Sequence, residues 1–220
     1  VKIRKKSTVF SDFSRYHFTN PFCLSLIFLS CVGFFLAYWV GSYELVSLFT
    51  FSPFTFENGK IHFGSPSGEY WRVVTPVFLH FGWLHLVFNC LWLWELGGKI
   101  EKTFGGLHLL AQFIFVATVS NFAQSFWSGP SLFGGMSGVV YGLLGFCWME
   151  SKINSDSSLQ LQNGILWFML GWLIACMIGL VEAMGFGAIA NSAHVGGLAA
   201  GILLGWASGI LRVESKDSKI

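Results

Sequence analysis

The feature that most constrains this chain is its long apolar runs without a charge. Residues 21–40 contain no Asp, Glu, Lys or Arg, and similar runs recur to about residue 210. A helix of about 20 residues crosses the roughly 30 Å hydrocarbon core of a bilayer. Only 11% of the 220 residues are charged, whereas a typical soluble domain has about 25%. The sequence therefore predicts an all-α protein that spans a membrane.

Breaks in the apolar pattern divide the chain into six predicted transmembrane helices in one bundle. They cover about 21–40, 82–98, 107–127, 137–149, 163–181 and 190–210. Residues 42–79 form a long first loop, for which we expect short structured pieces that dip partly into the membrane. Residues 21–210 are predicted to be one membrane domain, with short tails at 1–20 and 211–220. The chain shows no internal repeat.

The positions of lysine and arginine predict the orientation of this bundle. Cytosolic loops of membrane proteins carry an excess of these residues. With both termini inside, only Lys60 and Arg72 fall on the outer side. We therefore expect cytosolic N- and C-termini. The residues on the inner side are Lys2, Arg4, Lys5, Lys6, Arg15, Lys99, Lys102, Lys152, Arg212, Lys216 and Lys219.

The shortest predicted span begins at a serine within a glycine-rich stretch. Residues 134–138 read Gly-Gly-Met-Ser-Gly, and Glu150 ends the apolar run. About 13 helical residues span roughly 20 Å, so Ser137 lies roughly 10 Å below one membrane face if Glu150 marks the other. A hydroxyl at that depth needs buried partners or a water-filled cavity. We therefore expect a polar site inside the membrane at Ser137.

Two histidines are predicted at a similar depth on two other helices. His85 lies 14 residues before Lys99, about 21 Å from the inner face by the helical rise. His194 lies 18 residues before Arg212, about 27 Å by the same rise. Ionisable groups in membrane spans are costly and usually face the bundle interior. An imidazole that accepts its proton makes a serine hydroxyl nucleophilic, so Ser137 and His194 predict a nucleophile and its general base.

The predicted outer-half spans contain no aspartate, so the sequence permits a Ser–His dyad without a third member. Ser137 opens a helix, whose free N–H groups and dipole favour a developing oxyanion. His85 and Asn89 share one helix face and can donate to the same oxyanion. Asn191, one turn before His194, is expected to orient or assist it. Structural interpretations stay open, because such a serine is usually a cap and such a histidine is often an interhelical hydrogen bonder.

Other residues are expected to serve structure. Glycines at 197, 201 and 205 are typical of close helix packing, which would bring His194 toward the fourth helix. Glu101 lies in a predicted charged loop at 99–102 and is expected to form an ion pair with a neighbouring lysine. Trp71-Arg72 is either an interface anchor or a loop brace. His80 is expected to hydrogen-bond within the first loop, and we expect exposed side chains at His17, His62 and His108.

Four motifs together resemble the rhomboid intramembrane serine proteases, specifically the bacterial six-helix members of the GlpG type. The resemblance covers about residues 71–206, and the motifs occur in the family's order with matching helix spacing. They are Trp71-Arg72, His85-Leu86-Val87-Phe88-Asn89, Gly135-Met136-Ser137-Gly138, and Ala193-His194-Val195-Gly196-Gly197 with Gly201.

The resemblance implies a serine endopeptidase that hydrolyses peptide bonds in or next to transmembrane segments of membrane proteins. It implies that Ser137 is the nucleophile and His194 the base. His85, Asn89 and the backbone N–H of Ser137 would form the oxyanion hole. Tyr141, one helical turn after Ser137, would pack beside His194.

The resemblance also implies the setting of the reaction. We expect a multi-pass protein of the bacterial inner membrane whose site opens to the periplasm. Its partners would be transmembrane protein substrates and the lipid bilayer, with no nucleic acid, no metal and no organic cofactor. A monomer would suffice for catalysis, and the sequence leaves oligomers open. Lateral access is expected past the fifth helix, where Trp167, Phe168 and Trp172 would form an aromatic gate.

Three alternatives stay open on the sequence. A catalytically silent rhomboid-like protein that binds membrane clients for quality control would typically have lost Ser137 or His194, and both are present. A small transporter would favour inverted repeats and broken helices. A specialised protease that trims C-terminal sorting tails has the same sequence features as a general one.

Overall fold

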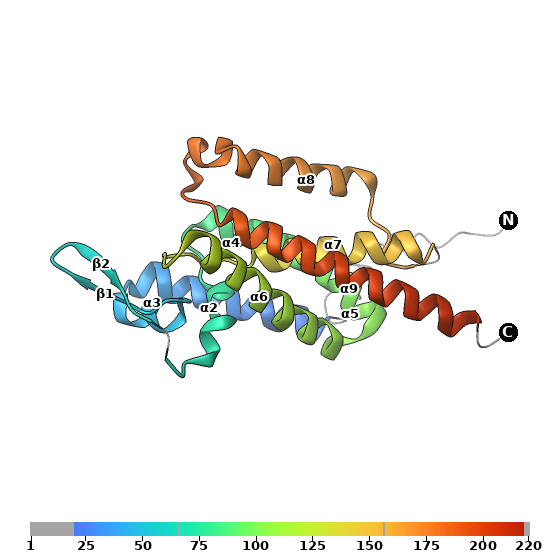
Figure 1. The fold of residues 1–220 in the computed structure, drawn as a ribbon, viewed down its shortest axis with the longest axis horizontal. Helices are drawn as coiled ribbons and strands as arrows, with labels where there is room; N and C mark the ends of the chain where they lie inside the picture. The colour runs from blue at the N-terminus through green and yellow to red at the C-terminus, as the bar shows by residue number, and fades with distance from the viewer. Residues whose placement is uncertain (1–19, 66, 156, 218–220) are drawn as a thin grey trace, which may run out of the picture.

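The computed structural model describes residues 20–65, 67–155 and 157–217, and these fold into a bundle of long helices (Figure 1). The segments Pro21–Val40, Gly106–Ser128 and Asn191–Glu214 are long and apolar enough to cross a membrane. The prediction of a mostly helical membrane protein is therefore confirmed, while the number of spans and the side of the termini stay predictions. The predicted N-terminal tail at 1–20, with its cations and His17, lies outside the described residues except for Asn20.

The first predicted helix has the expected bounds. It consists of α2 (Pro21–Phe35) and a wider π-helical turn, η1 (Leu36–Val40). The buried carboxylate of Glu101 accepts hydrogen bonds from the backbone N–H groups of Phe22 and Cys23, at 3.0 and 2.8 Å. First-turn N–H groups lack intrahelical partners and favour a nearby anion. The expectation of an ion pair at Glu101 is thus corrected, because this carboxylate caps α2.

The long first loop contains several short elements, as expected. They are α3 (Tyr43–Phe49), an antiparallel hairpin of β1 (Phe54–Glu57) and β2 (Lys60–Phe63), and the 3₁₀ turns η2 (Tyr70–Val73) and η3 (Thr75–Phe78). In the hairpin, Phe54 pairs with Phe63 and Glu57 pairs with Lys60. The spacing of the phenylalanines in this loop did not predict the hairpin.

Trp71 and Arg72 hold this loop together. The buried guanidinium of Arg72 donates to the backbone carbonyls of Ser47 and Thr50. The indole N–H of Trp71 donates to the carbonyl of Leu48 at 3.0 Å. Trp71-Arg72 was interpreted as either an interface anchor or a loop brace, and these contacts support the loop brace.

The second predicted helix continues further than expected. α4 (Trp83–Trp92), the π-helical turn η4 (Leu93–Gly97) and α5 (Gly98–Phe104) follow one another without a break. The prediction of a charged loop at 99–102 is therefore wrong. The segment stays helical because Ile100 packs in the core and Lys99 pairs with Glu95 one turn earlier, at 2.9 Å. The helix ends at Gly105, whose φ of 91° suits glycine.

The remaining helices are α6 (Gly106–Ser128), α7 (Ser137–Ile153), α8 (Asn163–Met177), a π-helical turn η5 (Glu182–Phe186) and α9 (Asn191–Asp217). α7 does not end at Glu150, as the sequence suggested. The Glu150 carboxylate is fully buried and bonds Arg212 of α9 at 2.8 Å, with further bonds from Asn154 and Ser157. A paired acid can lie inside a bundle, so Glu150 does not mark an aqueous helix end. α9 likewise runs into the predicted C-terminal tail.

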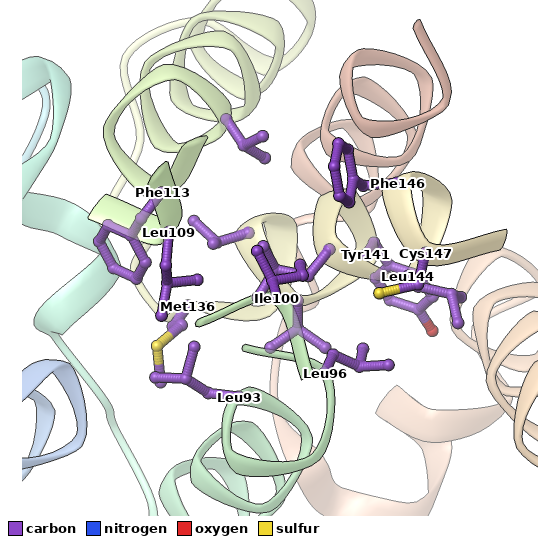
Figure 2. Packing of buried hydrophobic residues seen from close by; sticks show 14 of the residues in the cluster. Leu93, Leu96, Ile100, Leu109, Phe113, Met136, Tyr141, Leu144, Phe146 and Cys147 are labelled. Atoms are coloured by element: carbon purple, nitrogen blue, oxygen red, sulfur yellow. The ribbon is translucent and has the colours of Figure 1, made fainter. Parts of the chain in front are cut away.

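The core surrounds α7. Figure 2 shows Met136, Leu144 and Cys147 packed among side chains of the neighbouring helices, and all of them are buried. The neighbours labelled there include Leu93, Leu96 and Ile100 from η4 and α5, and Leu109 and Phe113 from α6. A helix that is apolar on every side belongs in the centre of a bundle, which is the place of α7.

α9 crosses α7 at very short range along a line of glycines. A Cβ atom added at Gly197 or Gly201 would overlap the carbonyl oxygen of Gly138 or Gly142 on α7. One at Gly205 would crowd the backbone of Phe146 in the same way. The prediction of close packing is confirmed. The contact brings the first turns of α7 and α9 together, and these turns carry Ser137 and His194.

Candidate active site

Ser137 is the first residue of α7, and two glycines shape the loop before it. Gly135 has a φ of 111°, which L side chains rarely adopt. A Cβ atom there would overlap the ring of His85, and one at Gly134 would lie 2.8 Å from Leu79. The Gly135 N–H donates to the carbonyl of Pro76 at 3.0 Å. The Gly-Gly pair therefore lets the loop pass between His85 and Leu79 and start α7 at Ser137.

His194 lies directly opposite Ser137. Its Nε2 is 2.7 Å from the Ser137 Oγ, within hydrogen-bonding distance. His194 is only 5% exposed, and its Nδ1 has no hydrogen-bond partner among the described residues. With Nδ1 protonated, Nε2 has a free lone pair for the serine proton. The geometry thus allows proton transfer from the hydroxyl to the imidazole.

Tyr141 packs beside the same imidazole. The two ring centroids are 4.9 Å apart, and the planes are inclined by 43°. The Tyr141 hydroxyl donates to the carbonyl of Met169 on α8 at 3.0 Å. Tyr141 therefore connects three elements, because it belongs to α7, contacts His194 of α9 and bonds α8.

His85 and Asn89 lie on α4 and line the same cavity as Ser137. The Asn89 Nδ2 donates to the carbonyl of His85 at 2.9 Å, which commits one amide hydrogen to its own helix. The ring of His80 lies 5.0 Å from that of His85. His80 is fully buried, with its Nδ1 3.1 Å from the carbonyl of Phe78, so its expected bond within the first loop is confirmed. His80 also packs behind His85, which the sequence did not indicate.

Asn191 makes a different contact from the one expected. Its Nδ2 donates to the carbonyl of Cys176 on α8 at 3.2 Å. Its Oδ1 is buried and has no partner among the residues that the structure describes. The structure thus gives Asn191 a contact between the start of α9 and the end of α8.

Gln124 of α6 caps the helix that carries His194, a contact that was not assigned from the sequence. Its Oε1 accepts the backbone N–H of Ala193 at 3.1 Å, so it caps the first turn of α9 next to His194. On the same helix, Asn121 donates to the carbonyl of Val73 at 2.9 Å. The available signal was the presence of amide side chains in an apolar span, which indicated contact with other helices without naming a partner.

His62 is exposed on the hairpin, as expected. His108 is half-buried rather than exposed, because its ring stacks on Phe104 with centroids 4.6 Å apart and also faces Phe146. The apolar neighbours come from α5 and α7. Phe146 is distant in the sequence, and Phe104 is separated from His108 by the Gly105 turn. The sequence therefore did not indicate that these two rings cover His108.

A cavity of about 610 Å³ contains the candidate site. Its lining includes Ser137, His194, His85, Asn89 and Tyr141, together with residues of α8 and of the segment 181–190. None of the described lining residues is Asp, Glu, Lys or Arg. A negative charge that develops here must be stabilised by hydrogen-bond donors and the start of α7, and such contacts are strong where the dielectric constant is low.

The cavity wall on the α8 side is built from aromatic residues. Trp172 stacks on Phe88 of α4 with ring centroids 5.5 Å apart, and Phe168 lies 5.9 Å from Trp92. Trp167 is 69% exposed on the same helix. Figure 1 shows α8 standing apart from the rest of the bundle. Phe168 and Trp172 thus form the aromatic part of the cavity wall on the α8 side.

These features define a helical membrane protein with a serine–histidine pair in an uncharged cavity at a helix start. A family model described as the rhomboid domain matches residues 67–210. The chain belongs to the rhomboid family.

Several curated relatives carry the name rhomboid protease GlpG. The protein from Klebsiella pneumoniae strain 342 is 44% identical over 136 residues, which cover 62% of this chain and 48% of that protein. The Serratia proteamaculans protein is 44% identical over 136 residues, covering 62% and 47%. The protein from Enterobacter sp. strain 638 is 42% identical over 144 residues, covering 64% and 50%. The chain thus spans about half the length of the curated relatives it matches.

Proposed function

We propose that this chain is an intramembrane serine endopeptidase that uses a Ser137–His194 dyad. The observation that carries the proposal is the 2.7 Å separation between Ser137 Oγ and His194 Nε2, at the start of α7 and inside a cavity between membrane helices. The family name of the relatives supports the same class of reaction.

In the first half-reaction, the Ser137 Oγ attacks the carbonyl carbon of the scissile peptide while its proton moves to His194 Nε2. The tetrahedral oxyanion accepts hydrogen bonds from the backbone N–H of Ser137 and from the side chains of His85 and Asn89. The intermediate then collapses. The C–N bond breaks, His194 gives its proton to the leaving amine, and an ester on Ser137 remains.

In the second half-reaction, water replaces the amine. His194 Nε2 takes a proton from the water as its oxygen attacks the ester carbonyl. The C–O bond to Ser137 breaks, the carboxylic acid product leaves, and the proton returns to Ser137 Oγ. Since no carboxylate bonds Nδ1 among the described residues, the imidazole depends on packing against Tyr141 for its orientation.

The substrates we propose are transmembrane or membrane-proximal segments of other proteins. A helix has its peptide bonds enclosed by its own side chains, so a substrate must unwind locally to reach Ser137. Segments with helix-destabilising residues and a small residue at the cut would be favoured. Entry would occur beside α8, with Phe168 and Trp172 as the gate and Trp167 on its outer surface.

For the topology, we propose six spans with cytosolic termini and a site that opens to the periplasm. The lysine and arginine distribution supports this orientation, and the bacterial sources of the relatives support an inner-membrane location. One copy holds five of the six candidate residues, all except Asn191, in one cavity, which supports a catalytically sufficient monomer.

The test is cleavage of a labelled transmembrane substrate by purified protein in liposomes. Wild type should cleave, and Ser137→Ala and His194→Ala should each abolish cleavage. Matched controls are Ser131→Ala in the preceding loop and His62→Ala on the hairpin, which should retain activity. Cleavage that survives Ser137→Ala would remove the proposed nucleophile. Substrate binding without cleavage by every form would favour the client-binding alternative.

A further inference from the structure

A second cavity lies between α6 and α9, away from the candidate active site. Its volume is about 280 Å³, and its lining includes Gln112 and Phe115 of α6 together with Leu204 and Ser208 of α9. Both helices are long and apolar enough to cross a membrane. Phe115 is 48% exposed, so this groove borders the region that a bilayer would occupy.

Gln112 is the unusual residue in this groove. It is only 5% exposed, and neither Nε2 nor Oε1 has a hydrogen-bond partner among the described residues. Leaving such an amide unpaired in an apolar setting costs free energy. Buried polar groups normally have a partner, and an orphan requires an explanation, of which a bound molecule is one. The groove therefore lacks the acceptor that the Gln112 amide requires.

The lining of the groove changes from polar to apolar along the helices. His108 and Ser208 lie at one end, near the first turn of α6 and the last turns of α9. Gln112 follows His108 by one turn on α6, Leu204 lies one turn inward from Ser208 on α9, and Phe115 lies nearly one further turn inward on α6. Arg212 lies one turn beyond Ser208, outside the groove; its guanidinium pairs with Glu150 at 2.8 Å, and about 35% of its side chain stays exposed. From the helix ends inward, the order is a cation outside the groove, then the polar groups beside the ring of Phe146, and then the amide next to apolar surface.

A glycerophospholipid has the same order of groups. Its phosphate is anionic, its ester carbonyls accept hydrogen bonds, and its acyl chains are apolar. We propose that the α6–α9 groove binds a glycerophospholipid, with Gln112 Nε2 donating to an acyl ester carbonyl. The acyl chain would then lie along Phe115 and Leu204, and the phosphate would face the end that carries Arg212.

Ester and ether phospholipids separate this contact from general lipid binding. An ether lipid has the same headgroup and chains but lacks the ester carbonyls. The protein would be placed in nanodiscs with equimolar diester and diether phosphatidylglycerol, released gently, and examined by native mass spectrometry. The wild type should retain the ester lipid about three- to tenfold over the ether lipid, the range of one hydrogen bond. Because the readout is binding, it does not depend on the proposed peptidase activity.

Substitutions on α6 test whether this groove is responsible for the preference for ester over ether lipid. Gln112→Leu should lose the ester preference while keeping a similar shape. Thr118→Val is the matched control on α6, because its hydroxyl bonds its own helix at the carbonyl of Ile114, and it should keep the preference. Ala111→Phe, at another lining position, should reduce retention of both lipids. Equal retention of both lipids by the wild type, or a preference that survives Gln112→Leu, would overturn the proposal.

Discussion

The imidazole of His194 is oriented by packing and backbone contacts. Tyr141 lies against the ring, Ser137 faces Nε2, and Gln124 caps the backbone at Ala193 immediately before it. Two of these contacts come from α7, and the third comes from α6. At the scale of single residues, the proposed chemistry thus depends also on Tyr141 and Gln124, which touch no peptide bond themselves.

The aromatic ring of Tyr141 should matter more than its hydroxyl. Tyr141→Ala removes the surface against which His194 packs, and we expect at least a tenfold loss of kcat because a misplaced base loses its alignment. Tyr141→Phe keeps the ring and loses only the bond to Met169, so most of kcat should remain. Steady-state kinetics in proteoliposomes measures both. Similar losses in the two variants would contradict a packing role.

His85 should contribute to transition-state stabilisation. His85→Ala removes a proposed oxyanion donor, and such a loss typically lowers kcat by about 10²- to 10³-fold. Asn89→Ala should cost less, because one of its two amide hydrogens already bonds the His85 carbonyl. Both variants should change KM little. A rise in KM at unchanged kcat would instead assign His85 to substrate binding.

At the scale of elements, the contact between α7 and α9 sets the distance between the dyad members. A Cβ atom at Gly197 or Gly201 would overlap the backbone carbonyl of Gly138 or Gly142, and these carbonyls cannot move without displacing α7 itself. A side chain in this line must therefore separate the helices. The proposed nucleophile and base lie at the end of the same contact.

Gly201→Ala should lower both stability and activity. Overpacking a tight contact costs about 1–3 kcal/mol, and the upper end applies here because the clash is with backbone. Gly171→Ala on α8 is the matched control, since no atom lies within 4 Å of an added Cβ there. Thermal unfolding in detergent should show a lower Tm only for Gly201→Ala. Equal Tm values would contradict the proposed role of the close contact.

At the scale of the whole molecule, the buried carboxylate of Glu150 holds several elements together at the end of the bundle opposite the candidate site. Glu150 of α7 receives bonds from Arg212 of α9 and from the loop residues Asn154 and Ser157. The Arg212 guanidinium also lies 4.9 Å above the ring of Phe104 at the end of α5. This cluster therefore connects three helices and a loop far from the proposed chemistry.

Removing the cation should destabilise the bundle without changing the chemistry. Arg212→Ala leaves the buried carboxylate of Glu150 unpaired, which costs roughly 3 kcal/mol. Replacing both residues, as Glu150→Gln with Arg212→Gln, should recover part of that loss because no buried charge remains. Tm measurements on the single and double variants test this, and a double variant less stable than Arg212→Ala would contradict it.

Local patterns in the sequence predicted much of this architecture. Apolar run lengths identified the first and third helices, and glycine spacing identified the α7–α9 contact. Depth counting predicted one level for Ser137, His85 and His194, and the structure places them around one cavity, although the marker Glu150 is buried and does not lie at a membrane face. These features depend on residues that are close in sequence or equally spaced.

The features that were missed depend on partners far away in the chain. Glu150 looked like a helix end because its partner Arg212 is 62 residues later. Glu101 looked like an ion pair, yet it caps α2, which is 78 residues earlier at Cys23. An amide such as Gln124 in an apolar span indicates contact with another helix. That it accepts the N–H of Ala193 is visible only in the folded structure. A polar residue in an apolar span therefore indicates that a partner exists without identifying it.

The central claim is that His194 activates Ser137, and labelling with a fluorophosphonate tests it most directly. The probe forms a bond only with an activated serine, and it requires no knowledge of the substrate. In membranes, mass spectrometry should find the adduct on the peptide that contains Ser137, and His194→Ala should abolish it while His62→Ala leaves it intact. An adduct on another serine, or undiminished labelling of Ser137 in His194→Ala, would contradict the account.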